Sequence, residues 1–204
     1  GPFANIAHGT NTILADEMGL SLADYTVTEA GFAADLGFEK FGDIVARRGL
    51  VPDAVVVVAT VRALKYHGLD MWPVEYDRLS DPDPAAVRAG LPNLERHLDT
   101  VDRFGLPAVV AVNRFPSDTD AEVRAVVEEL ESRGVRVAVS EVHARGSAGG
   151  RELADHVVEM VESGATNFEP LYDLTDSLEE KIETVAREVY GAAAVTITDD
   201  ARDD

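Results

Sequence analysis

The chain has 204 residues, of which 46% are hydrophobic, and a formal net charge of −20. This composition indicates a globular protein with a buried core, and it excludes a disordered chain. Because the sequence has no cysteine, disulfides and thiolate zinc sites are excluded as well. No apolar run approaches the roughly 20 residues that span a bilayer, and no signal-peptide pattern opens the sequence, so we expect a cytoplasmic protein.

The charge comes from 38 acidic residues against 18 lysines and arginines. Such a surface repels nucleic acid and anionic membranes, so neither is expected as a partner. The acidic residues fit either an adaptation to high salt or an acidic face that binds a partner. They are spread along the whole chain and form a short tail only at residues 199–204. This spread favours the halophilic explanation, because a dedicated binding tail would be a block.

Short apolar runs alternate with amphipathic helical patterns along the chain. The patterns predict strands at residues 24–28, 54–60, 108–112, 135–140 and 192–198. They predict helices at residues 38–48, 84–104, 120–133, 150–162 and 177–191. Thr119 and Glu122 have the capping-box spacing at the start of one helix, and Ser177 and Glu180 have it at the start of another. The alternation predicts an α/β fold with doubly wound, mostly parallel sheets.

Ligands of such sheets bind beyond the carboxyl ends of the strands, so the loops that follow the predicted strands are the places to search. The loop after residues 24–28 carries Glu29, Gly31, Asp35 and Lys40. Its carboxylates can hold Mg²⁺ beside a nucleotide, and its glycines allow backbone N–H groups to approach an anion. A tight turn that leads into a helix explains the same residues, and from spacing alone both interpretations stay open.

The loop after residues 54–60 carries Arg62, Lys65 and His67, the densest positive cluster of the chain. Pairing with acidic neighbours is one explanation of this cluster. We favour binding of a phosphate or carboxylate, because an acidic surface dilutes positive charge unless a site requires it.

The loop after residues 108–112 begins with Asn113 and continues through Phe115 and Pro116. An aromatic ring followed by proline is well placed to stack on a flat ligand, whose edge Asn113 can bind. An ordinary turn with Phe115 in the core is the alternative. The next strand is followed by His143, Arg145 and the glycine-rich residues 146–150. No lysine follows these glycines, so the pattern is not a P-loop, and we interpret the segment as a loop that carries His143 and Arg145 to a site.

Five segments, taken in chain order, resemble formate–tetrahydrofolate ligases: GPFANIAHG, VTEAGFAADLGFEKF, PDAVVVVATVRALKYHG, NLERHLDTVDRFGLPAVVAVNRFPSDT and NFEPLYDLTDSLEEKIETVAREVYGA. The likeness runs through nearly the whole chain and breaks mainly around residues 69–90, where this sequence is shorter. It implies a P-loop NTPase-like part and a C-terminal α/β domain. Residues 1–104 would then be the C-terminal part of the nucleotide-binding region without its P-loop, and residues 105–204 the folate-side domain.

The resemblance also implies a reaction. ATP, with Mg²⁺, phosphorylates formate to formyl phosphate, and the N10 amine of tetrahydrofolate attacks this intermediate to give 10-formyltetrahydrofolate, ADP and phosphate. A monovalent cation and a homotetramer belong to the same expectation. Since the P-loop is absent, we expect a fragment of the ligase that is inactive by itself.

Carried over residue by residue, Phe115 forms one wall of a folate-stacking slot, with Pro116 lining it and Asn113 beside it. The family's other wall is typically a tryptophan, and His143 occupies that position here. The resemblance places Arg62 and Lys65 near formyl phosphate. The nucleotide-facing loop would supply Glu29, Gly31, Asp35 and Lys40, with Glu29 or Asp35 as a possible Mg²⁺ ligand.

Two other functions remain to be weighed. One is a non-catalytic folate-binding module, or a subunit that completes a separate P-loop chain. The other is an ATPase or ligase of the dethiobiotin-synthetase type, against which the NRFP and NFEPLYDL segments argue.

Overall fold

The computed structural model describes residues 7–69, 72–73 and 75–203. The opening residues of GPFANIAHG therefore lie outside the described part. By its contacts the chain forms two compact units, Gly1–Val51 with Phe168–Asp204 and Pro52–Asn167. The second unit contains the sheet.

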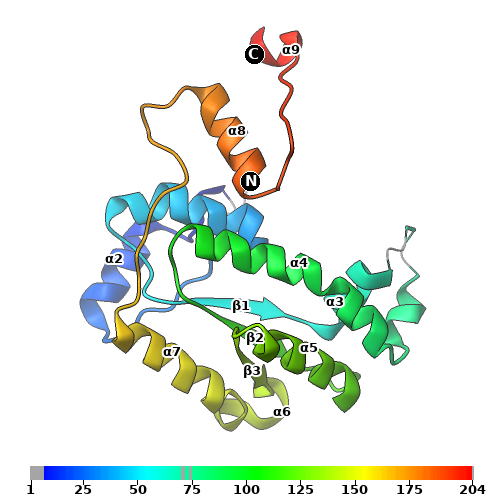
Figure 1. Ribbon diagram of the computed structural model, residues 1–204. Helices are drawn as coiled ribbons and strands as arrows, with labels where there is room; N and C mark the ends of the chain where they lie inside the picture. Colours follow the sequence, from blue (N-terminus) through cyan, green and yellow to red (C-terminus); the bar gives the residue numbers. More distant parts are fainter. Residues whose placement is uncertain (1–6, 70–71, 74, 204) are drawn as a thin grey trace. The chain divides into compact units, whose positions relative to one another are not determined.

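The sheet has three parallel strands in the order β1-β2-β3 (Figure 1). They are β1 (Val55–Ala59), β2 (Ala108–Asn113) and β3 (Arg136–Ser140). All three coincide with predicted strands. The expected burial on both faces holds for β2, whereas one face of β1 is exposed at Val56 and Val58. The predicted α/β class with a parallel sheet is confirmed.

Helices connect these strands and follow the last one. The helical elements of this unit are α3 (Val61–Leu69), a 3₁₀ turn (Tyr76–Ser80), α4 (Pro84–Arg103), α5 (Asp120–Ser132), α6 (Val142–Arg145), a second 3₁₀ turn (Gly146–Gly150) and α7 (Arg151–Ser163). Asp83 begins α4 by accepting a hydrogen bond from the Ala86 N–H, and the predicted capping box of Thr119 and Glu122 begins α5. The predicted helices at residues 84–104, 120–133 and 150–162 are thereby confirmed.

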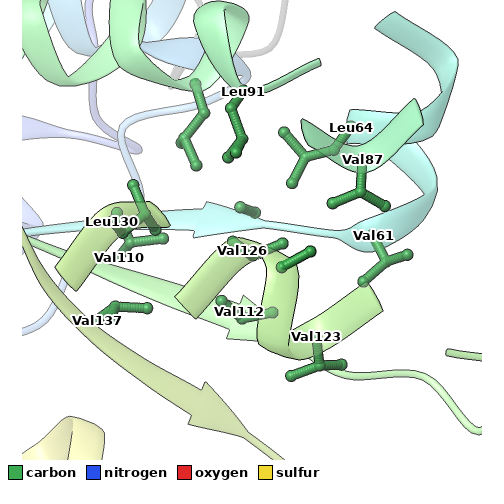
Figure 2. Close-up of a cluster of buried hydrophobic side chains, with 13 residues drawn as sticks. Val61, Leu64, Val87, Leu91, Val110, Val112, Val123, Val126, Leu130 and Val137 are labelled. Atoms are coloured by element: carbon green, nitrogen blue, oxygen red, sulfur yellow. The ribbon is translucent and has the colours of Figure 1, made fainter. Parts of the chain in front are cut away.

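The core of this unit lies between one face of the sheet and helices α3, α4 and α5 (Figure 2). Its buried cluster consists of Ala59, Val61, Leu64, Val87, Leu91, Leu94, Val110, Val112, Val123, Ala125, Val126, Leu130 and Val137. Because side chains alternate along a strand, Val109 and Ala111 of β2 point to the opposite face, where α7 packs against β2 and β3. The central strand is therefore buried on both sides.

Strand β1 lies at the edge of the described sheet. The N–H of Val55 donates to the Pro107 carbonyl, so the alternating N–H groups of Val56 and Val58 face away from β2. The side chains of Val56 and Val58 are 39% and 64% exposed. In the described part of the chain, this edge pairs with no further strand.

Helices α3 and α4 cross at two glycines. A β-carbon on Gly68 would lie 1.8 Å from the Ala86 carbonyl oxygen, and one on Gly90 would lie 2.0 Å from the Leu64 carbonyl oxygen. Both distances are far below van der Waals contact, so this crossing requires glycine on both helices.

We expect Gly90→Ala to lower the free energy of unfolding by roughly 2–3 kcal/mol. Alanine favours a helix by about 1 kcal/mol over glycine, but the clash with backbone atoms of α3 outweighs this gain. Denaturant unfolding of the chain measures the change. Ala89→Ser, at an exposed neighbouring position on α4, is the control and should stay within about 0.5 kcal/mol. An equally stable Gly90→Ala protein would show that the two helices can separate at no cost.

The other unit is helical in its described part. Its elements are α2 (Ile13–Leu22), two π-helical segments (Ala33–Phe38 and Phe41–Val45), a 3₁₀ turn (Ala46–Arg48), α8 (Leu178–Glu188) and α9 (Asp199–Asp203). The predicted helix at 38–48 thus consists mainly of π-helical and 3₁₀ segments and ends, as expected, at Gly49, whose φ is +87°. Ser177 and Glu180 form the predicted capping box of α8.

The prediction of strands at residues 24–28 and 192–198 of this unit is wrong, because the described structure has no strand at either segment. Neither segment has a ladder partner, and a strand exists only through such pairing. Because β1 pairs with β2 and α4 packs on both strands, residues on either side of position 104 belong to one compact unit. The division into a nucleotide-binding part at residues 1–104 and a folate-side domain at residues 105–204 stays a prediction.

Candidate ligand-binding edge of the sheet

The loops that follow β1, β2 and β3 lie at one edge of the sheet. Parallel pairing brings Ala59 beside Val112 and Asn113 beside Ser140, so the three carboxyl ends are neighbours. The loop that carries Glu29 to Lys40 belongs to the other unit. The sequence therefore located three of the four searched loops at this edge.

The loop after β2 is held by Asp118. Its Oδ2 accepts a hydrogen bond from the Phe115 N–H at 2.8 Å, and its own N–H donates to the Phe115 carbonyl at 3.0 Å. These bonds fix the backbone while the Phe115 side chain remains 48% exposed and Pro116 is exposed too. The alternative in which Phe115 enters the core is thereby excluded. Asn113 is half-buried at the end of β2.

The loop after β3 folds back on the strand end. The Glu141 N–H donates to the Gly149 carbonyl at 2.9 Å, and a β-carbon on Gly149 would lie 2.5 Å from backbone atoms of Glu141. Between them, α6 carries the exposed side chains of His143 and Arg145. Glycine at position 149 is thus what allows this short loop to close.

Ion pairs join the two loops. Arg114 donates its backbone N–H to the Ser140 carbonyl at 3.0 Å, and its Nη1 lies 3.5 Å from Glu141 Oε1. The other oxygen of Glu141 accepts from Arg145 Nη1 at 2.9 Å, and Arg114 Nη2 donates to Asp120 Oδ1 at 2.5 Å. Sequence reasoning did not select Arg114 or Glu141. Arg114 directly precedes the selected Phe115, and Glu141 directly follows the predicted strand that ends at Ser140.

Lys65 is buried and is only 3% exposed. Its Nζ lies 2.9 Å from Glu122 Oε1 and donates to the Asp81 carbonyl at 3.0 Å. The ammonium group therefore joins α3 to the start of α5. The sequence identified Glu122 as a helix cap, but it gave no signal for this second role.

Glu122 is fully buried and accepts hydrogen bonds from the N–H of Asp83, from the N–H and hydroxyl of Thr119, and from Lys65. Burial alone would raise the pKa of Glu122. The hydrogen bonds from Lys65, Asp83 and Thr119 outweigh burial and hold the pKa at about 2. The Glu122 carboxyl is thus ionised at neutral pH.

Arg62 differs from Lys65. It lies in the first turn of α3, where Thr60 Oγ1 accepts from the Ala63 N–H, and its side chain is exposed. Its guanidinium carbon lies 5.7 Å from the ring centroid of Tyr76, a cation–π distance. Of the two predicted cationic residues, Arg62 is the one whose charge is accessible at the sheet edge.

The predicted nucleotide-facing residues all lie in the helical unit. Glu29 is exposed, and Gly31 has a φ of +86°, which favours glycine. The Asp35 carbonyl accepts from the Tyr190 hydroxyl at 2.8 Å, and Lys40 Nζ donates to the Leu36 carbonyl at 3.0 Å. Within residues 7–69, 72–73 and 75–203, no three His, Cys, Asp or Glu side chains gather as a metal site would require.

The same unit contains buried carboxyls that sequence reasoning did not select, and two of them, Glu39 and Asp43, lie close together in and beside the second π-helical segment. Burial raises the pKa of both groups, and for Glu39 the neighbouring Asp43 adds to the rise while Lys40 opposes it. Asp43 Oδ1 accepts from the Leu171 N–H at 3.0 Å and lies 3.3 Å from Arg47 Nη2. Asp43 thereby fastens the segment after residue 168 to the π-helical turns.

None of the helices that the structure describes is long and apolar enough to cross a membrane.

Comparison of the sequence with known proteins identifies the family that the chain resembles. The family model described as formate–tetrahydrofolate ligase matches residues 1–204. The chain is 55% identical over 207 aligned residues to the formate–tetrahydrofolate ligase of Haloarcula marismortui, covering 100% of the chain and 37% of that protein. It is 53% identical to the enzyme of the same name from Haloquadratum walsbyi, covering 100% of the chain and 36% of that protein. The chain thus spans little more than a third of the length of these relatives.

Proposed function

The chain belongs to the formate–tetrahydrofolate ligase family, and from this premise we propose that it supplies the folate-side part of an enzyme that ligates formate to tetrahydrofolate with ATP. ATP phosphorylates formate, and the N10 amine of tetrahydrofolate displaces phosphate from formyl phosphate. Formate and the γ-phosphate are both anions, so cationic groups must bring them together and stabilise the transferred charge.

The observation that carries this proposal is the exposed ring of Phe115. A large aromatic side chain that is 48% exposed, followed by the exposed Pro116, offers a flat apolar surface at the carboxyl edge of a parallel sheet. Folate has flat rings that stack on such surfaces. We assign Phe115 to one wall of the folate slot, Pro116 to its lining, Asn113 to the ring edge and His143 to the opposite wall.

His143 gives this assignment a direct test. Imidazole offers less apolar area than the indole that the family typically has at this position, so His143→Trp should tighten tetrahydrofolate binding, by roughly three- to tenfold. Fluorescence titration of the full-length protein with tetrahydrofolate measures the effect, and Arg136→Ala at the opposite edge of the sheet is the control. An unchanged affinity would count against His143 as a wall of the slot.

For the anionic reactants we assign Arg62, whose guanidinium is exposed, to the region of formyl phosphate. Lys65 is already engaged by Glu122, so we assign it to holding α3 and α5 together near that region. Glu29, Gly31, Asp35 and Lys40 are proposed to face the nucleotide, with Glu29 or Asp35 reaching Mg²⁺. A monovalent cation is proposed as a further requirement.

The phosphate-binding loop lies outside these residues, since no GxxxxGK[ST] pattern occurs in them. We therefore expect the full-length protein to form 10-formyltetrahydrofolate from formate, ATP and tetrahydrofolate, and the 204-residue chain to form none. Turnover is measured by the absorbance of the acid-converted methenyl product. Clear turnover by the chain alone would contradict the proposed division of the site.

A non-catalytic folate-binding module, or a subunit that completes a separate P-loop chain, is the second candidate. This candidate would use Phe115 for folate in the same way, and the gene sequence distinguishes it from the ligase. An in-frame upstream extension with a P-loop supports the ligase, and a start codon near Gly1 supports a separate chain.

We propose a cytoplasmic, halophilic enzyme whose partners are small molecules and copies of itself. Sedimentation in molar salt tests whether it forms a tetramer.

A further inference from the structure

We propose that Arg114 and Arg145, joined by Glu141, form the subsite that binds the carboxylates of the glutamate portion of folate. This inference rests on the proposed function, because it extends the folate slot beside Phe115. It names the anionic end of the substrate and the residues that select for it.

The geometry supplies two cations beside the aromatic wall. Arg114 directly precedes Phe115, and Arg145 lies on α6, two residues after His143. One carboxylate spans them, with Glu141 Oε1 3.5 Å from Arg114 and Oε2 2.9 Å from Arg145. Since the two oxygens belong to one group, the guanidinium groups lie close to each other on either side of it.

Both guanidinium groups retain donors for a ligand. Each has five N–H groups in a planar fork that suits a carboxylate. Glu141 engages one terminal nitrogen of each arginine, and Asp120 engages the other terminal nitrogen of Arg114. The side chains of Arg114 and Arg145 are 31% and 61% exposed, so ligand can reach both.

Stability does not explain this arrangement, because exposed ion pairs contribute little to folding. Glu141 and Asp120 balance the charge of the two arginines, so recognition of an anion at this place depends on the guanidinium N–H groups that these carboxylates leave unengaged. Tetrahydrofolate has flat rings at one end and a glutamate with two carboxylates at the other. An aromatic wall and two exposed arginine forks on neighbouring loops offer one partner for each of these two ends.

The test compares two ligands on the full-length protein. Tetrahydrofolate carries the glutamate, and tetrahydropteroate is the same molecule without it. Arg145→Ala is expected to weaken tetrahydrofolate binding about tenfold and to leave tetrahydropteroate binding unchanged, with Arg145→Lys in between because it keeps the charge and loses the fork. Arg136→Ala removes a similarly exposed ion pair with Glu159 at the opposite end of β3 and should change neither affinity.

Arg114→Ala is measured in the same way, and adding salt should reduce the difference between the two ligands in the unchanged protein. Equal losses for both ligands in Arg145→Ala, or no loss for either, would overturn the subsite. If the unchanged protein binds both ligands with the same affinity, the glutamate is not recognised and the subsite is also excluded. Failure of the unchanged protein to bind either ligand would remove the proposed function and this subsite with it.

Discussion

Replacing Glu122 with glutamine is expected to lower the free energy of unfolding by roughly 3 kcal/mol at neutral pH. The side chain is fully buried, and its carboxylate is the partner of the buried Lys65 ammonium at 2.9 Å. Glutamine has a single acceptor oxygen, so it can keep the hydrogen bonds from Thr119 or the one from Asp83 but not both, and it leaves the Lys65 charge without its counter-ion. Denaturant unfolding of both proteins measures the difference.

The effect should depend on pH in a defined direction. The pKa of Glu122 is about 2 in the folded chain, below its ordinary value of 4.5, so its contribution to stability is complete above pH 4.5. The contribution is lost as the pH falls from 4.5 towards 2. The difference between the original and Glu122→Gln proteins should therefore be constant from pH 7 to 5 and should shrink below that range.

A second replacement separates the ion pair from the helix cap. Lys65→Met leaves the Glu122 carboxylate buried without its counter-ion and should also destabilise the chain, whereas Lys65→Met combined with Glu122→Gln should cost less than the sum of the two single changes. Glu128→Gln, on the exposed face of α5, is the control and should have little effect. Additive single changes would show that the two side chains stabilise the fold independently.

Replacing Phe115 with alanine is expected to weaken tetrahydrofolate binding by roughly ten- to a hundredfold in the full-length protein. Stacking of a flat ring on an aromatic side chain contributes about 1–3 kcal/mol, and alanine removes that surface. Because the Phe115 backbone is held by Asp118 and its ring is half exposed, the loop should keep its conformation. Titration with tetrahydrofolate, monitored by intrinsic fluorescence, measures the loss.

Three controls define what Phe115→Ala removes. Phe115→Tyr keeps the ring and should retain most of the affinity. ATP binding should be unchanged, because the ring is assigned to folate alone. Leu178→Ala removes an exposed apolar side chain from α8 and should leave tetrahydrofolate binding as it was. If Phe115→Ala binds tetrahydrofolate normally, folate does not stack at this loop.

The sequence correctly predicted β1, β2 and β3, because each has a run of apolar residues that is typical of a buried strand. The apolar runs of β1 and β2 place apolar side chains on both faces, and β3 has two valines on one face, so these strands can be recognised without knowing their neighbours. Residues 24–28 and 192–198 alternate apolar residues with threonine, which also predicts a strand, but they have no ladder partner in the described structure. Strand propensity expresses a fit to a neighbouring strand, so a single segment cannot reveal that its neighbour is absent.

The sequence could predict which loops surround the candidate site, but it could not predict which side chains contact one another there. The rule that ligands bind at the carboxyl ends of strands selected the loops with Arg62, Phe115 and His143. It could not distinguish Arg62, which is exposed, from Lys65, whose ammonium is buried against a carboxylate far along the sequence. Glu141 likewise gains its role only where β2 and β3 lie side by side.

The open edge of β1 has a consequence for how this chain behaves at high concentration. Outward-facing N–H groups and the exposed Val56 and Val58 side chains form a template on which a second molecule can add a strand. At low salt the charge of −20 keeps molecules apart, and salt screens that repulsion while excluded anions strengthen apolar association. For the isolated chain, the salt that suits an acidic surface is therefore also the salt that promotes self-association through β1.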